Sequence, residues 1–189
     1  MAVATGAAGV LGPALPSFQT PPPKWIVQGR IFERPSNKTG EILRWKDTRT
    51  GNVLFRRELF AQGKLWFDTD YGRGGEDRDF FRRMIAAGNQ FIWCNEAVAW
   101  ETIPPSRCTR RFQLRRALLR GKAGMPVPFA NFPRSAKSFL AILAYLPVLP
   151  VMFILSHGLF MKYLIKTFDH IGVALAFFGA NVIKTHYLS

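Results

Sequence analysis

Apolar residues recur with a helical period after the glycines of the segment GRGGEDRDFFRRM at 72–84. They lie three and four residues apart, as on one face of a helix, and Gly88 is a natural stop. These apolar residues are Phe80, Phe81, Met84 and Ile85. The pattern predicts a helix over 76–87.

Short apolar runs bounded by turn residues predict strands. The segment TGNVLFRRELF suggests a buried strand over 52–55, and QFIWC at 90–94 and AVAW at 97–100 suggest two more. Two prolines in ETIPPSR then end regular structure. We interpret residues 1–24 as a short strand or loop followed by a proline-rich connector.

A further helix is predicted over 109–120, with Thr109 as its N-cap and Gly121 as its stop. Its apolar residues do not form one stripe, because Phe112 and Leu119 face away from the other leucines. We therefore expect this helix to be partly buried and partly in contact with lipid headgroups.

Residues 138–160 contain no Lys, Arg, Asp or Glu. A helix of this length crosses a hydrocarbon core of about 30 Å, and membrane helices tolerate proline. We expect a membrane span or a deep re-entrant helix here. Charged or titratable residues interrupt the next apolar stretch, 163–183, which fits a tilted second span or an interfacial helix.

The chain is strongly basic, with 26 Lys and Arg against 12 Asp and Glu and a formal net charge of +14 over 189 residues. This excess predicts an anionic partner. Nine Lys or Arg and no acid lie between Arg107 and Lys137, directly before the uncharged run. Such a collar is typical of the cytoplasmic face of a membrane. Nucleic acid is not an expected partner, because the chain lacks zinc-ligand spacing and RNA-recognition signatures.

The carboxylates of Glu76 and Asp77 follow directly after glycines that let the backbone approach a ligand closely. They stand at the predicted start of a helix, where the helix dipole favours negative charge. Two interpretations remain open from these residues alone: the acids complement the dipole, or they act on a ligand.

Three segments in order carry a family resemblance: TGNVLFRRELF, then FDTDYGRGGEDRDFFRRMIAAG, then AVAWETIPPSRCTRRFQLRRALLRG. Together they resemble the C-terminal half of a bacterial family 2 glycosyltransferase. The resemblance implies an α/β fold class: the acceptor-side part of a GT-A domain, followed by C-terminal membrane helices. It assigns 1–125 to the partial catalytic domain, 126–137 to a basic linker and 138–189 to a membrane-associated tail.

The resemblance gives the acid pair a chemical role. It implies that Asp77 is the general base of an inverting transfer and takes the proton from an acceptor hydroxyl that attacks the anomeric carbon of a nucleotide sugar. It also implies acceptor-side binding residues, although Asn52 fits a plain strand start equally well, and the two arginines fit solvent or lipid contacts. These acceptor-side residues are Glu76, Gly74, Gly75, Asn52, Arg107 and Arg111.

The chain departs from the family in two ways. The family's donor-binding half, with an Asp-x-Asp motif for Mg²⁺ or Mn²⁺, has no counterpart here, because DTD at 68–70 and DRD at 77–79 are misplaced for it. We therefore expect a truncated reading frame or one part of a split enzyme, inactive alone and without a metal motif of its own. Processive members carry Gln-x-x-Arg-Trp where this chain has Cys108, Arg111 and Phe112, which favours single addition.

The leading hypothesis is a membrane-associated glycosyltransferase of surface polysaccharide or glycolipid biosynthesis, on the cytoplasmic side of a bacterial inner membrane. Its implied partners are a nucleotide-sugar donor, a lipid-linked or saccharide acceptor and membrane lipids. The alternative is a non-catalytic accessory protein that binds lipid-linked phosphates through its basic collar.

Overall fold

The computed structural model of the chain describes residues 2–61, 67, 75–122, 129 and 131–180. These residues pack into two units. Unit 1 comprises Met1–Ser17 and Glu33–Glu101, and unit 2 comprises Phe18–Phe32 and Thr102–Ser189. The proposed division at residue 125 stays a prediction, since these units describe packing and not function.

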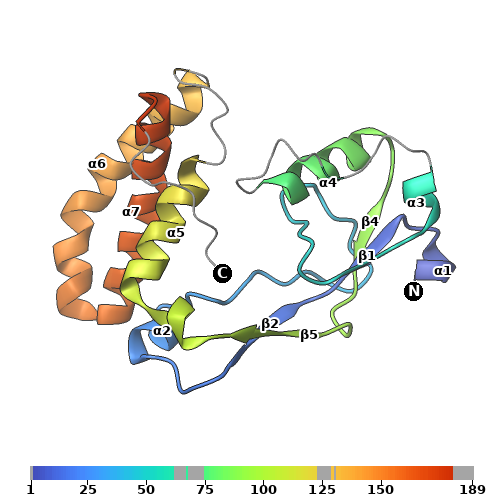
Figure 1. Cartoon of the computed structure of the whole chain (residues 1–189), viewed down its shortest axis with the longest axis horizontal. Helices are drawn as coiled ribbons and strands as arrows, with labels where there is room; N and C mark the ends of the chain where they lie inside the picture. Colours follow the sequence, from blue (N-terminus) through green and yellow to red (C-terminus); the bar gives the residue numbers. More distant parts are fainter. Residues whose placement is uncertain (1, 62–66, 68–74, 123–128, 130, 181–189) are drawn as a thin grey trace. The chain divides into compact units, whose positions relative to one another are not determined.

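Unit 1 is built on a three-stranded sheet with the order β3-β1-β4 (Figure 1). β1 (Gly9–Leu11) is parallel to β4 (Phe91–Trp93) and antiparallel to β3 (Val53–Phe55). The short helices α1 (Ala2–Thr5) and α3 (Glu58–Ala61) complete the unit near the sheet. Mixed α/β structure is confirmed, although the sheet is small.

One helix, α4 (Glu76–Ala86), packs on this sheet and forms the core of unit 1. Phe80, Phe81 and Met84 are fully buried against Leu11 and Phe91. Burying such side chains contributes about 1.5–3 kcal/mol each, which fixes the helix on the sheet. The helix predicted over 76–87 is thus confirmed to within one residue.

The strand predicted over 52–55 forms as β3, but it is not a buried strand. Leu54 in its middle is 65 % exposed, because β3 pairs with β1 alone among the described strands and alternates its side chains across the sheet. The strand predicted at 90–94 is fully buried as β4, with Ile42 bridging to Ile92 on its other side.

A two-stranded ribbon joins β2 (Ala14–Phe18) to β5 (Ala99–Ile103). The strand predicted at 97–100 forms as β5, which begins two residues later and ends at Ile103. Pro104 follows it and is the N-cap of the 3₁₀ helix η2 (Pro105–Cys108). The chain passes from one unit to the other within β2, after Phe32 and within β5.

Unit 2 is helical, with α7 (His157–Phe177) between α5 (Arg110–Lys122) and α6 (Phe132–Leu155) (Figure 1). The short helix α2 (Lys24–Gln28) also packs on α7. The core of unit 2 gathers side chains from α2, α5, α7 and the end of β5, but none from α6. Its members include Trp25, Ile26, Ile103, Ala117, Met161 and Ile165.

Thr109 caps α5 as predicted, since its hydroxyl accepts a hydrogen bond from the backbone N–H of Phe112 at 3.2 Å. Gly121 does not stop the helix, which continues to Lys122. A Cβ atom on Gly121 would lie 2.1 Å from the carbonyl oxygen of Asp169, and one on Gly172 would lie 2.3 Å from that of Leu118. Glycine at these two positions allows the backbones of α5 and α7 to approach closely.

The apolar tail also differs from its prediction. α6 begins at Phe132, inside the segment expected as a linker, and ends at Leu155, where Ser156 adopts an extended conformation. α7 then runs back along α6. The polar residues that interrupt α7 have protein partners: Asp169 pairs with Arg120 at 2.6 Å, and His170 lies 3.1 Å from the Ser138 hydroxyl.

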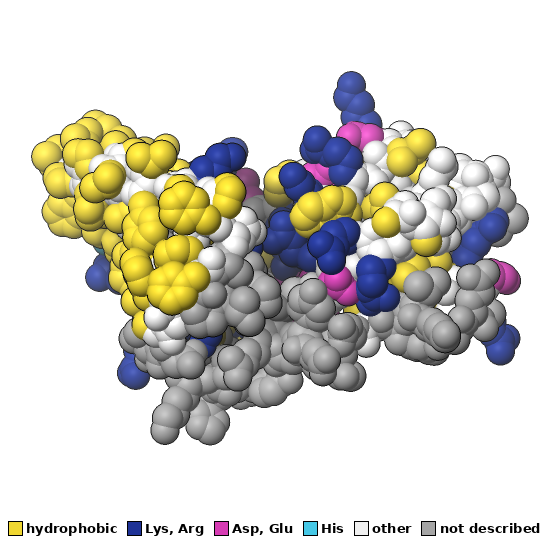
Figure 2. All heavy atoms as spheres, turned by 90° about the horizontal axis from the view of Figure 1, so that it is seen from above, with side chains coloured by type: hydrophobic (Ala, Val, Ile, Leu, Met, Phe, Trp, Pro, Cys, Tyr) yellow, Lys and Arg dark blue, Asp and Glu magenta, His cyan; other side chains and the backbone are white. Residues whose placement is uncertain are grey.

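Among the described residues, one helix, α6, has the length and the apolar composition needed to cross a membrane. Unlike α7, it leaves most of its apolar surface exposed. Figure 2 shows hydrophobic side chains gathered over this part of unit 2. This is weak evidence for membrane association.

Candidate functional site

The first turn of α4 carries the predicted acid pair. Gly75 precedes the helix with φ of 113°, a left-handed conformation that glycine adopts without strain, and its carbonyl accepts the backbone N–H of Asp79 at 3.0 Å. The helix therefore begins at Glu76, as the pattern indicates. Its buried phenylalanines hold this first turn at the surface of unit 1.

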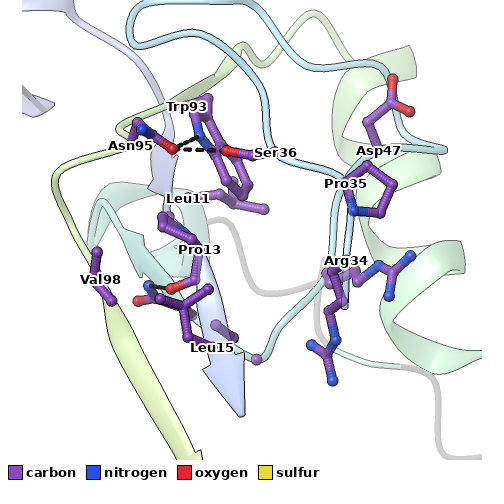
Figure 3. A pocket seen from close by; sticks show the side chains of 15 residues that line it. Leu11, Pro13, Leu15, Arg34, Pro35, Ser36, Asp47, Trp93, Asn95 and Val98 are labelled. Atoms are coloured by element: carbon purple, nitrogen blue, oxygen red, sulfur yellow. Dashed lines mark hydrogen bonds between the residues drawn. The ribbon is translucent and has the colours of Figure 1, made fainter. Parts of the chain in front are cut away.

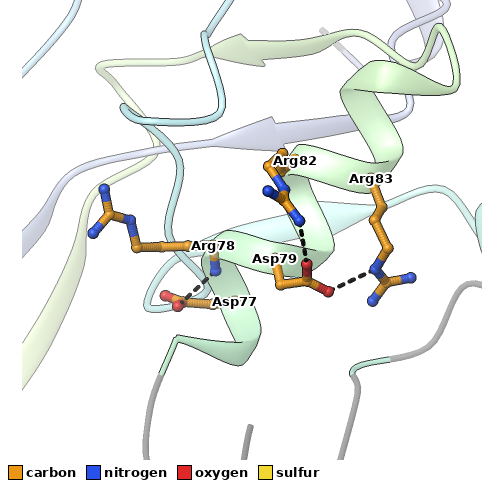
Figure 4. Close-up of polar contacts among 5 residues, drawn as sticks. All are labelled: Asp77, Arg78, Asp79, Arg82 and Arg83. Carbon is orange, nitrogen blue, oxygen red and sulfur yellow. Dashed lines mark hydrogen bonds and ion pairs between the residues drawn. The ribbon is translucent and has the colours of Figure 1, made fainter. Parts of the chain in front are cut away.

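The carboxylates in this turn have different surroundings (Figure 4). Asp79 is only 8 % exposed and accepts from Arg83 at 2.6 Å and from Arg82 at 3.3 Å. Asp77 is half-buried and accepts the backbone N–H of Arg78 at 2.8 Å.

Glu76 is exposed, and no ion pair holds it or Asp77 in the part of the chain that the structure describes. Asp79 is thus engaged in the structure, whereas the two predicted site acids keep carboxylate oxygens for a ligand.

A neighbouring segment links this turn to a cavity in the same unit. The guanidinium of Arg78 lies over the ring of Trp45, 5.5 Å from its centroid, and Trp45 packs against the core that holds α4. The following residues, Asp47 and Arg49, line the cavity. Thr48 between them is buried and donates its hydroxyl to the Trp45 carbonyl at 2.8 Å, which fixes the turn.

The cavity has a volume of about 220 Å³ (Figure 3). It is lined by polar and apolar side chains from the ends of β1 and β4 and from the segments before β3. The polar and aromatic members are Arg34, Ser36, Asp47, Arg49, Asn52, Trp93 and Asn95. Guanidinium, amide and hydroxyl groups beside an indole ring suit a small ligand with hydroxyl or anionic groups.

Hydrogen bonds hold the rim of this cavity in place. Asn95 Oδ1 accepts from the Ser36 hydroxyl at 2.7 Å and from Trp93 Nε1 at 3.5 Å. Arg34 pairs with Glu101 at 2.8 Å. Nearby, a hydrogen bond from the Thr39 hydroxyl, with further ones from the Glu96 backbone and the Cys94 thiol, lowers the pKa of Glu96.

Asn52 has a structural function at the cavity. Its Nδ2 donates to the carbonyls of Pro13 at 3.0 Å and Ala97 at 2.7 Å, and thereby joins two loops. Gly12 lies so close that a Cβ there would be 2.1 Å from the Ala97 oxygen. Asn52 directly precedes β3, as a strand start does, and it also ties the two loops and lines the cavity; its part in acceptor binding stays a prediction.

The remaining predicted binding residues lie elsewhere. Arg107 lies in the last turn of η2, and its carbonyl accepts a hydrogen bond from Gln113 Nε2 at 2.7 Å, while Arg111 is an exposed residue of α5. Both belong to unit 2, whereas Glu76, Asp77 and Asn52 belong to unit 1. Gly74 and the DTD segment lie outside the described residues.

Sequence reasoning missed the cavity residues Arg34, Arg49, Trp93 and Asn95. They come from separate segments of unit 1, and no motif joins them in the sequence. The one available signal was Asn52 itself, whose neighbourhood RWKDTRTGN concentrates charged residues immediately before a strand.

The family resemblance implies a metal ion. Within the described ranges, no three His, Cys, Asp or Glu side chains gather to hold a metal. Asp77 and Asp79 of the DRD segment do not share a site, since the second is paired with two arginines. The described residues do not fit a metal.

The chain is similar to the succinoglycan biosynthesis protein ExoM of Rhizobium meliloti (strain 1021). The two are 33 % identical over 123 residues, which cover 62 % of this chain and 38 % of ExoM. The matching region thus spans well under half the length of that relative. No family model and no solved structure matches the chain.

Proposed function

We propose that this chain is the acceptor-side part of a membrane-associated glycosyltransferase of polysaccharide or glycolipid biosynthesis. The similarity to a succinoglycan biosynthesis protein supports a place in that chemistry. The observation that carries the proposal is the state of Asp77. Its carboxylate stands in the first turn of α4, two residues after Gly75, with no cation paired to it among the described residues.

In this proposal Asp77 acts as the general base. A carboxylate oxygen takes the proton of an acceptor hydroxyl while that oxygen attacks the anomeric carbon of a nucleotide sugar, and the nucleotide diphosphate leaves from the opposite face with inversion. Such a base must lie within about 2.6–3.2 Å of the hydroxyl. Asp77 stands in the first turn of α4, at the end of the helix where the dipole favours negative charge.

The neighbouring residues would bind the acceptor. Glu76 is exposed beside Asp77 and accepts hydrogen bonds from hydroxyl groups, and Gly75 leaves its backbone accessible. The nucleotide-sugar donor, the Mg²⁺ or Mn²⁺ of the complete enzyme and the contribution of Arg107 and Arg111 to phosphate binding stay predictions. So does location on the cytoplasmic side of a bacterial inner membrane.

The second candidate is an accessory protein that holds lipid-linked phosphates without catalysis. The observation in its favour is the basic helix α5, whose thirteen residues include Arg110, Arg111, Arg115, Arg116 and Arg120. The two candidates differ at α4, because an accessory protein has no use for an unpaired Asp77.

The experiment measures initial transfer rates of a complete enzyme that contains this segment, at saturating donor. Asp77→Asn keeps the shape of the side chain but cannot accept the proton, so the rate should fall about 10²–10⁴-fold. Glu76→Gln should lower the rate less, mainly by weakening acceptor binding. Glu58→Gln is the matched control, because Glu58 is an exposed acid in the first turn of another helix.

Thermal melts show whether each variant folds. Asp79→Asn serves as a second comparison, because it removes a buried ion-pair partner and should lower stability before it lowers the rate of the folded fraction. If folded Asp77→Asn retains the parent rate, Asp77 is not the base and the accessory hypothesis is favoured.

A further inference from the structure

α6 presents an uncharged apolar stripe that no described residue covers. Its members recur three and four residues apart, so they lie on one helix face, and all are exposed. They are Leu140, Leu143, Pro147, Val151 and Ile154, here called the apolar stripe. Leu143 is 67 % exposed and Ile154 83 %. A contiguous exposed apolar surface of this kind marks an interaction site.

The opposite side of α6 packs on α7 in an antiparallel hairpin that turns at Ser156. Near the turn, Phe153 contacts Phe160, with ring centroids 5.2 Å apart. At the far end, Phe139 contacts Phe177 at 6.4 Å. These contacts fix which side of α6 faces the protein and leave the apolar stripe on the other side.

α5 runs beside α7 on its other flank and in the same direction. Arg110 at the start of α5 lies 2.9 Å from His157 at the start of α7, and Arg120 pairs with Asp169 further along both helices. Because α6 runs antiparallel to α7, Arg110 lies level with the end of α6 and Arg120 with its first half. The cations of α5 therefore extend over much of the length of α6.

This arrangement disfavours an upright orientation of α6 across a bilayer. If α6 stood along the membrane normal, α5 would stand with it, and its arginines would be distributed through the hydrocarbon core. Charges at that depth are strongly unfavourable. With α6 lying flat, the apolar stripe meets lipid along its whole length while α5, on the far side of α7, remains in water or among headgroups.

The charge of unit 2 favours an anionic membrane. Between them, its two segments carry fourteen Lys or Arg and a single acid, Asp169. Cations beside an apolar helix face are the combination by which interfacial helices bind anionic lipids.

We propose that α6 lies in the plane of an anionic membrane surface, with the apolar stripe inserted among the lipids, and does not cross the bilayer. The proposal rests on the membrane association contained in the proposed function and does not depend on sugar transfer. It replaces the membrane span or deep re-entrant helix expected from sequence with an interfacial anchor formed by unit 2.

The first experiment tests orientation with single cysteines in the full chain, after Cys94 and Cys108 are replaced by Ala. Gln28→Cys reports the turn end of the hairpin, because Gln28 lies against Gly158, and Lys137→Cys reports the other end; both native residues are exposed. A membrane-impermeant maleimide is added to right-side-out and to inside-out vesicles from expressing cells.

An in-plane α6 exposes both cysteines in the same vesicle preparation. A crossing α6 exposes one in each preparation, and that result overturns the proposal. Failure of the chain to sediment with membranes also overturns it, together with the membrane part of the proposed function. The rate test of Asp77 is unaffected by either outcome, so the two failures are distinguishable.

The second experiment tests the apolar stripe with purified full chain and vesicles. Binding is measured by co-sedimentation with phosphatidylcholine alone and with an equal mixture of phosphatidylcholine and phosphatidylglycerol. The parent should bind the anionic vesicles about tenfold more tightly or better. The double variant L143E/I154E should lose about tenfold or more of this binding.

Leu54→Glu is the matched control, because Leu54 is 65 % exposed in unit 1 and is not part of the apolar stripe. It should bind as the parent does. All substituted leucine and isoleucine positions are exposed, so thermal melts should change little. Parent-like binding by a folded L143E/I154E variant overturns the proposal.

Discussion

Unit 1 and unit 2 divide the charge of this chain very unequally. Unit 2 holds fourteen Lys or Arg and one acid, whereas unit 1 holds the other twelve Lys or Arg and eleven acids. In unit 1 several acids have close partners, as in the pairs of Arg34 with Glu101 and of Arg83 with Asp79. Nearly all the net charge of +14 therefore belongs to unit 2.

The exposed apolar surface follows the same division. Unit 1 buries its large core side chains under α4, while unit 2 leaves the apolar stripe of α6 open. A balanced surface with an available carboxylate suits binding and chemistry in water. A basic surface next to an exposed apolar helix suits attachment to an anionic membrane. The net charge of the chain thus describes unit 2 and not the candidate site in unit 1.

Because the two units have separate cores, a destabilising substitution in one unit should leave the stability of the other unit unchanged. Phe81→Ala empties a fully buried position in unit 1 and should lower the free energy of unfolding of that unit by about 3–5 kcal/mol. Hydrogen exchange should speed up in α4 and β4, and amides of α7 should stay protected. Leu54→Ala is the control and should change little, because Leu54 is exposed. Equal loss of protection in α7 would show that the units fold as one.

A substitution that damages unit 2 instead can be made where α5 and α7 pack closely. Gly172→Val places side-chain atoms where the Leu118 carbonyl already lies, so the helices must separate, at about 1–3 kcal/mol or more. Protection of α5 and α7 should fall while α4 keeps its own. Ala144→Val introduces the same residue at an exposed position of α6 and should cost only a few tenths of a kcal/mol. A normal melt for Gly172→Val would contradict the close packing described here.

The smallest effect concerns the polar surface of unit 1. The hydrogen bond from Thr39 is the main reason that the pKa of Glu96 is lowered. Because the folded-state pKa lies below the unfolded one, this bond stabilises the fold above the unfolded pKa and its contribution is lost as pH falls through the folded pKa. Thr39→Val should raise the pKa of Glu96, and Thr39→Ser should not. NMR titration of the Glu96 carboxyl decides, and equal values for the two variants would contradict the assignment.

Local features of the fold could be predicted from the sequence. The helical spacing of Phe80, Phe81 and Met84 predicted α4 to nearly its full extent, and Thr109 was correctly predicted as the N-cap of α5. Both predictions succeed because periodicity and capping depend on only a few neighbouring residues. The composition of 138–160 likewise indicated an apolar helix. Gly75 and the acid pair were located at the start of α4 by the same local signals.

The tertiary structure decided what those features do. Gly121 suits a helix stop in the sequence, but it lies against Asp169, which is 48 positions later in the chain. Asp77 and Asp79 are equivalent in a sequence motif, and only the packing of α4 buries one beside Arg83 and leaves the other available. The cavity beside Asn52 gathers several segments that no spacing relates.

The placement of α6 follows the same logic. Its composition determined that it is apolar, because that depends on the residues alone. Whether it stands upright or lies flat depends on what is packed beside it, and the arginines of α5 come next to α7 only through long-range contacts. Sequence fixes the preferences of single segments, while the neighbours that decide between two uses of a segment are set when the chain packs.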